Sequence, residues 1–179
     1  DPGDEIIVPE PAYANYEAFA IVAGAKIKSI AADIEEGFSL PPIEEFEKLI
    51  TPKTKGIMIC NPNNPTGTIT DSKKLLDFCS RVSEKVPVFV DEAYLWFLEE
   101  GAKHSMVSLI NEGKDVIIAR TFSKIHGMAG LRVGYAVAQE ATLDKLQQIT
   151  RAGMGISYPS VYAAMAAMDD DEFLGTSRT

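Results

Sequence analysis

The sequence predicts an α/β fold, a mostly parallel central sheet with helices on both faces. Short apolar runs alternate along the chain with segments of helical periodicity, which is the order expected of βαβ units. The run at residues 56–60 is apolar throughout, which is typical of a strand that is buried on both faces. Polar or glycine-rich loops directly follow three of the apolar runs, where the carboxyl ends of parallel strands commonly form a ligand site.

The predicted strands are short runs rich in Val, Ile and other apolar residues. Residues 26–31 alternate between polar and apolar side chains, whereas the other runs are nearly continuous, so most of the sheet is expected to be covered on both faces. The predicted strands cover residues 6–8, 26–31, 56–60, 86–90, 116–119 and 133–138.

The predicted helices are segments whose apolar residues recur three or four positions apart. The first carries Tyr16, Phe19, Ala20 and Ala23 on one face and ends at Gly24, a residue that readily adopts the conformation after a helix end. The other predicted helices open at Pro42, follow a cap at Thr70, and cover residues 142–151 and 158–168.

Composition excludes several classes of function. The 179 residues are 46% hydrophobic and 24% charged, as in one globular domain, and the net charge of -9 argues against a nucleic-acid partner. No apolar run approaches the roughly 18–20 residues that span a membrane. Cys60 and Cys79 are not paired in a CxxC motif, so we expect reduced thiols and a cytoplasmic location. His104 and His126 are too few to predict a metal site.

The first polar loop is Asn-Pro-Asn-Asn-Pro-Thr-Gly-Thr at residues 61–68. These residue types dominate turns, so a simple turn is one interpretation. The two prolines also fix the backbone, which would hold an Asn amide at a set angle toward a ligand oxygen. The loop alone does not decide between the two interpretations.

The second loop, Asp-Glu-Ala-Tyr at residues 91–94, begins with an acid directly after an apolar strand. A carboxylate in such a poorly solvated place needs a cationic partner or hydrogen-bond donors. Asp91 is therefore interpreted as a helix cap, as half of a structural ion pair, or as the group that holds a ligand cation such as a protonated pyridine nitrogen.

The third loop, residues 121–132, combines two hydroxyls, two glycines and Arg132. Hydroxyls, backbone N–H groups and a guanidinium together favour phosphate binding, although the spacing is not that of a nucleotide P-loop. Lys124 lies in the middle, after a largely apolar run. A solvated surface lysine is one interpretation; we expect instead a partly buried and nucleophilic amine.

In this order, the three motifs resemble those of the class I/II aminotransferases, enzymes of fold type I that use pyridoxal 5'-phosphate (PLP). The third reads Thr-Phe-Ser-Lys, then Ala-Gly-Leu-Arg-Val-Gly-Tyr. The chain is most similar to the histidinol-phosphate aminotransferase-like branch. This resemblance implies that Lys124 is catalytic and holds PLP as a Schiff base. It also implies that Asp91 pairs with the pyridine nitrogen, and that Asn64 and Tyr94 bond the phenolic oxygen.

The same resemblance assigns the remaining cofactor contacts. Thr121, Ser123 and Arg132 would hold the phosphate, and the aromatic ring of Tyr13 would stack on the cofactor. An ordinary core tyrosine is the alternative for Tyr13. The chain departs from the branch at His126, where an aromatic residue is common, so this histidine is either a variation on the substrate side or a solvated loop residue.

The resemblance also implies an activity: PLP-dependent transfer of an amino group between an amino acid and a 2-oxo acid. Histidinol phosphate and aromatic amino acids are candidate donors, and the full-length protein is expected to be a homodimer with no nucleic-acid or membrane partner. Another fold type I enzyme, such as a decarboxylase or lyase, and an effector-binding domain of a transcription regulator are the alternatives. We expect residues 1–179 to be the central part of the PLP-binding large domain, with the small C-terminal domain absent.

Overall fold

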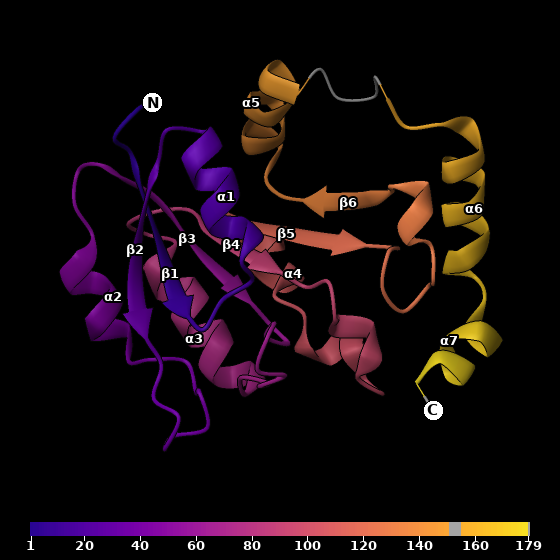
Figure 1. The fold of residues 1–179 in the computed structure, drawn as a ribbon, viewed down its shortest axis with the longest axis horizontal. Coiled ribbons are helices and arrows are strands. Elements are labelled where there is room, and N and C mark those ends of the chain that lie inside the picture. Colours follow the sequence, from indigo (N-terminus) through magenta and orange to yellow (C-terminus); the bar gives the residue numbers. More distant parts are fainter. Residues whose placement is uncertain (151–154, 179) are drawn as a thin grey trace.

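The computed structural model describes residues 1–150 and 155–178, and its strands form one six-stranded sheet in the order β2-β1-β3-β4-β5-β6 (Figure 1). The strands from β1 to β5 run parallel to their neighbours, whereas β6 is antiparallel to β5. The predicted mostly parallel sheet is therefore confirmed. The strands are β1 (Glu5–Glu10), β2 (Lys26–Ala31), β3 (Thr54–Cys60), β4 (Val88–Asp91), β5 (Val116–Thr121) and β6 (Gly134–Val137).

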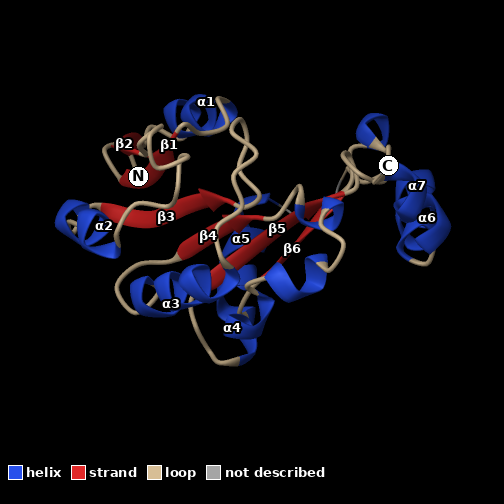
Figure 2. Ribbon diagram, turned by 90° about the horizontal axis from the view of Figure 1, so that it is seen from below, coloured by secondary structure: helices blue, strands red, loops and turns tan. Residues whose placement is uncertain are grey.

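Helices cover both faces of this sheet, as predicted. Figure 2 shows α1 on one face and α3 and α4 on the other. The helices are α1 (Asn15–Val22), α2 (Ile43–Leu49), α3 (Ser72–Val82), α4 (Val107–Asn111), α5 (Glu140–Thr150), α6 (Tyr158–Met168) and α7 (Asp171–Ser177), with short 3₁₀ turns η1 (Leu95–Phe97), η2 (Gly101–His104) and η3 (Ala129–Leu131).

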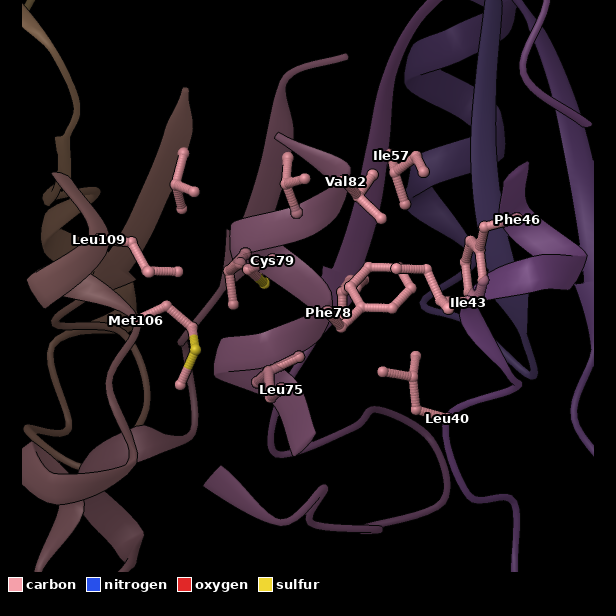
Figure 3. Packing of buried hydrophobic residues seen from close by; sticks show 14 of the residues in the cluster. Leu40, Ile43, Phe46, Ile57, Leu75, Phe78, Cys79, Val82, Met106 and Leu109 are labelled. Atoms are coloured by element: carbon pink, nitrogen blue, oxygen red, sulfur yellow. The ribbon is translucent and has the colours of Figure 1, made fainter. Parts of the chain in front are cut away.

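The main hydrophobic core lies between the sheet and the helices α2, α3 and α4 (Figure 3). Phe46 of α2 and Phe78 of α3 meet edge to face with ring centroids 4.7 Å apart. Ile57 and Ile59 of β3 contribute to this core, while Cys60 packs with Tyr16 on the other face. Alternation along β3 thus explains why its sequence is apolar throughout.

Several boundaries differ from the prediction by a few residues, and the structure adds elements. Strand β4 begins at Val88 rather than at residue 86. Helix α3 is capped by Asp71 instead of Thr70, because the Asp71 carboxylate accepts the N–H groups of Lys73 and Lys74. The chain also forms helix α7 after residue 170, where no element was predicted. Position 151, the predicted end of the helix that begins at residue 142, lies outside the described residues.

The reversal of β6 goes with the lack of a crossover helix between β5 and β6. A parallel return commonly runs through a crossover helix, whereas the loop from Phe122 to Val133 contains only the 3₁₀ turn η3, and β6 returns beside β5 in the opposite direction. Within the described ranges, no helix is both long enough and apolar enough to cross a membrane.

Candidate functional site

The carboxyl ends of β1, β3, β4 and β5 open onto one cleft of about 440 Å³. All three loops singled out in the sequence contribute to its walls, as the parallel arrangement of the strands predicts. Its lining includes Tyr13, Asn64, Asp91, Tyr94, Thr121, Ser123, Lys124 and Arg132, the full set of predicted site residues.

Asp91 is the last residue of β4, is half-buried, and lines the cleft at the carboxyl end of the strand. Its Oδ1 accepts the backbone N–H of Ala93 at 3.0 Å, and its Oδ2 accepts the hydroxyl of Tyr16 at 2.7 Å. Among the described residues it takes part in no ion pair, so the structural salt bridge considered above is not formed. The carboxylate is therefore held by neutral donors and keeps its charge available to a cation in the cleft.

Tyr16, on the first turn of α1, is a site residue that the sequence interpretation missed. It is only 8% exposed. Burial, together with the charge of Asp91, raises the pKa of the Tyr16 phenol far above its ordinary value, so the hydroxyl remains a donor. The spacing of Tyr13 and Tyr16, three residues apart at a helix start, is the signal that could have indicated it, since such residues share a face.

Asn64 and Tyr94 form a ready pair at the cleft wall: the Asn64 amide donates to the Tyr94 hydroxyl at 2.9 Å. The Lys124 amine lies 5.2 Å from the centre of the Tyr94 ring. Lys124 is exposed, so the predicted partial burial is wrong. Phe122 and Ile125 turn into the protein, 5% and 3% exposed, while Lys124 between them lines the open cleft.

The third loop folds back on itself and returns Arg132 to the cleft. Thr121 Oγ1 accepts the N–H of Ser123 at 3.0 Å, which tightens the loop after β5. Arg132 has left-handed backbone angles (φ 51°, ψ 51°), which are uncommon without glycine and cost of order 1–3 kcal/mol. At Gly134 a Cβ would lie 2.7 Å from the Arg120 carbonyl oxygen, so only glycine lets β6 approach β5 here.

Cys60 also lines the cleft, but it is a poor nucleophile. Burial, reinforced by the charge of Asp91, raises the pKa of its thiol to about 11, and the thiol donates to the Pro62 carbonyl. It therefore stays protonated near neutral pH. Lys124 is the one lysine in the described lining, so it is the group best suited to attack a carbonyl compound bound there.

A buried ion pair holds the ends of β4 and β5 together. Glu92 is 1% exposed and accepts Arg120 Nε at 2.9 Å, while the Met106 N–H and the Ser105 hydroxyl complete its hydrogen bonds. Glu92 follows Asp91, and Arg120 precedes Thr121. The pair thus fixes the distance between the carboxylate and the third loop; the sequence interpretation did not identify it.

His126 lies away from the cleft. Its ring packs against Phe122, with centroids 4.9 Å apart and planes tilted by 42°, and lines a separate cavity of about 260 Å³ beside Trp96 and Tyr135. Burial lowers the pKa of His126. It is therefore neither a residue of this cleft nor a fully solvated loop histidine.

The chain matches the protein-family model "Aminotransferase class I and II" over residues 1–179. It belongs to this family. The sequence-based recognition of the family is therefore confirmed, and the fold seen here is that of its members.

The class I and II aminotransferases that this chain resembles include two curated histidinol-phosphate aminotransferases. That of Caldicellulosiruptor saccharolyticus is 37% identical over 174 residues, 97% of this chain and 47% of the relative. That of Staphylococcus epidermidis is 38% identical over 173 residues, 97% of this chain and 48% of the relative. The chain thus spans about half the length of the curated relatives it matches.

Solved aminotransferase structures also superpose on this chain. A double mutant of Thermus thermophilus aspartate aminotransferase superposes with a TM-score of 0.86 at 28% identity, over 99% of this chain and 47% of that one. Alanine aminotransferase from Pyrococcus furiosus has a TM-score of 0.84 at 33% identity, with the same coverage. Relatives with different named amino-acid substrates therefore share this part of the fold.

Proposed function

We propose that this chain forms the PLP site of an aminotransferase that moves an amino group between an amino acid and a 2-oxo acid. The observation that carries the proposal is the convergence of one amine, one carboxylate, an amide–phenol pair and a hydroxyl–guanidinium loop on a single cleft. These groups come from the ends of three separate strands, β3, β4 and β5. Family membership supports the same reaction class.

The side chains present fit each functional group of PLP. The Lys124 amine suits the aldehyde, and the Asp91 carboxylate suits a protonated pyridine nitrogen. The Asn64 and Tyr94 pair, 2.9 Å apart, suits the phenolic oxygen. Thr121, Ser123 and Arg132 supply hydroxyls and a positive charge for the phosphate, and the ring of Tyr13 offers an aromatic face at the rim.

When bound, PLP supplies an electron-withdrawing ring that eases removal of the proton from the substrate Cα. The Asp91 carboxylate would hold the ring nitrogen in its protonated form, because an adjacent negative charge favours the cation. The Lys124 amine would first anchor the cofactor and then, once released, take the proton from the substrate Cα and deliver it to the C4′ carbon of the cofactor. Its exposure toward the open cleft allows both movements.

The amino donor is the finer part of the proposal. Curated relatives named histidinol-phosphate aminotransferase favour histidinol phosphate, with aromatic amino acids as the next candidates. We further propose that residues 1–179 correspond to the central part of the large domain and that the active protein is a cytoplasmic homodimer. Free, buried Cys60 and Cys79 are compatible with a reducing compartment.

Covalent attachment to Lys124 is the decisive test. The protein, expressed with whatever natural sequence flanks these residues, would be incubated with PLP, reduced with borohydride and digested for mass spectrometry. The expected result is one modified peptide carrying the adduct on Lys124, which is absent from Lys124→Ala. Lys103→Ala, which changes an exposed lysine outside the cleft, should keep the adduct.

Transfer itself is measured with a ¹⁵N-labelled amino donor and an unlabelled 2-oxo acid. Appearance of the label in a new amino acid, lost in Lys124→Ala, supports the proposal. A Lys124 adduct with release of CO₂ and no label transfer would instead indicate a decarboxylase. An adduct on another lysine, with Lys124→Ala unaffected, would refute the assignment of the site.

A further inference from the structure

Tyr16 links helix α1 to the carboxylate at the end of β4. Its hydroxyl donates to Asp91 Oδ2 at 2.7 Å, across 75 positions of the sequence. The ring lies edge-on to Tyr13, with centroids 5.6 Å apart and planes at 88°. One buried side chain therefore contacts both residues proposed to meet the cofactor ring.

The Tyr16 hydroxyl gives the Asp91 carboxylate a second hydrogen-bond donor, in addition to the backbone N–H of Ala93. The Ala93 N–H holds Asp91 Oδ1, but a single donor leaves the carboxylate able to rotate about its last bond. A second donor on Oδ2, provided by a different element, fixes the plane of the group. The Tyr16 hydroxyl lies 2.7 Å from Asp91 Oδ2, and a hydrogen bond to a carboxylate is stronger than one between neutral groups.

The setting of Tyr16 makes this donor permanent. The side chain is 8% exposed, and it packs with Val8 and Cys60 beneath α1. Its phenol does not ionise near neutral pH, since burial and the charge of Asp91 raise its pKa far above the ordinary value. The Tyr16 hydroxyl therefore stays protonated and able to donate to Asp91 Oδ2, and its burial limits competition from water for that oxygen.

We propose that Tyr16 is a positioning residue: its hydroxyl orients the Asp91 carboxylate toward the cofactor's ring nitrogen. This rests on the proposed function, because it assumes that Asp91 meets that nitrogen. Tyr16 is not among the residues that line the cleft, and it acts through its hydrogen bond to Asp91. It extends the site beyond the groups that touch the cofactor.

Replacement by Phe separates the hydroxyl from the ring, since Tyr16→Phe keeps the packing against Tyr13. PLP affinity would be measured by titration of the unreduced protein, with and without Asp91→Asn. We expect Tyr16→Phe to weaken binding about tenfold, in line with the loss of one hydrogen bond to a charged group. In the Asp91→Asn background the same change should weaken binding less than about twofold, because the charged acceptor is gone.

Two further measurements make the outcome decisive. Tyr162→Phe removes the hydroxyl of a tyrosine that is 68% exposed on α6, and should leave PLP affinity unchanged. Urea unfolding of each variant shows that the fold is retained. Unchanged affinity in Tyr16→Phe, or an equal loss in both backgrounds, would overturn this inference while the Lys124 adduct still supports the function. Failure of the unaltered protein to bind PLP would refute both.

Discussion

Replacing Arg120 with Met is expected to destabilise the protein far more than removal of any surface cation. The Arg120 side chain is 13% exposed and that of Glu92 is 1% exposed. Without Arg120, the Glu92 carboxylate keeps the Ser105 hydroxyl and the Met106 N–H as donors but loses its counter-charge. A buried charge left unpaired in this way costs about 3–5 kcal/mol.

That loss is a large share of the stability of a typical domain, about 5–15 kcal/mol. Urea unfolding followed by circular dichroism would measure it as a lower midpoint. Lys48→Met is the matched control, because Lys48 pairs with Glu45 at 2.6 Å on the surface, where an ion pair contributes little. The double change Arg120→Met with Glu92→Met should recover much of the loss, since it removes the unpaired charge.

The reasoning would be refuted if Arg120→Met lowered the free energy of unfolding no more than Lys48→Met. It would also be refuted if the double variant were as unstable as Arg120→Met alone. In that case the loss would come from packing of the Arg120 stem against Trp96 and Tyr135, which lie 5.3 and 5.9 Å from its guanidinium carbon, and not from Glu92.

Two other variants test local features of the fold by urea unfolding. Asp71→Ala should lower the free energy of unfolding by about 1 kcal/mol, because its carboxylate caps α3 through two N–H groups at 3.0 Å; Asp77→Ala, on the exposed face of α3, should change it little, and equal effects would contradict the cap. Burial lowers the pKa of His126 from 6.5, so the unfolded chain binds more protons than the folded one just below that pH. The associated stability is present above pH 6.5 and is lost as the pH falls through the folded pKa; His126→Gln should remove this part of the pH dependence, and identical pH profiles would contradict it.

Much of the fold could be predicted because continuous apolar runs indicate strands that are buried on both faces. The apolar run that ends at Cys60 is buried on both faces, and parallel strands bring the following loops to one edge, so Asn64, Asp91 and Lys124 were expected together. The antiparallel β6 was not predicted, since an apolar run carries no direction. The reversal follows from the connection before it, which contains no crossover helix.

The missed site features depend on long-range contacts. Tyr16 reads as a helix-packing residue, and only the structure shows its hydroxyl on Asp91. The sequence interpretation assigned a role to Asp91 and none to Glu92, although Glu92 is the more deeply buried of the two. Lys124 was expected to be partly buried from its apolar neighbours. In the folded loop, the neighbours Phe122 and Ile125 are buried while Lys124 faces the cleft, so apolar neighbours did not bury the lysine.

The cleft draws its walls from segments as far apart as Tyr13 and Arg132, on the ends of four different strands. No short segment of the chain can therefore bind a ligand there before the sheet is assembled. Ligand occupancy and completion of the sheet are linked equilibria, so a ligand at 100 times its Kd adds about 2.7 kcal/mol to the free energy of unfolding. That stabilisation acts on the sheet as a whole, so a ligand of the cleft would raise the fraction of chains that are folded.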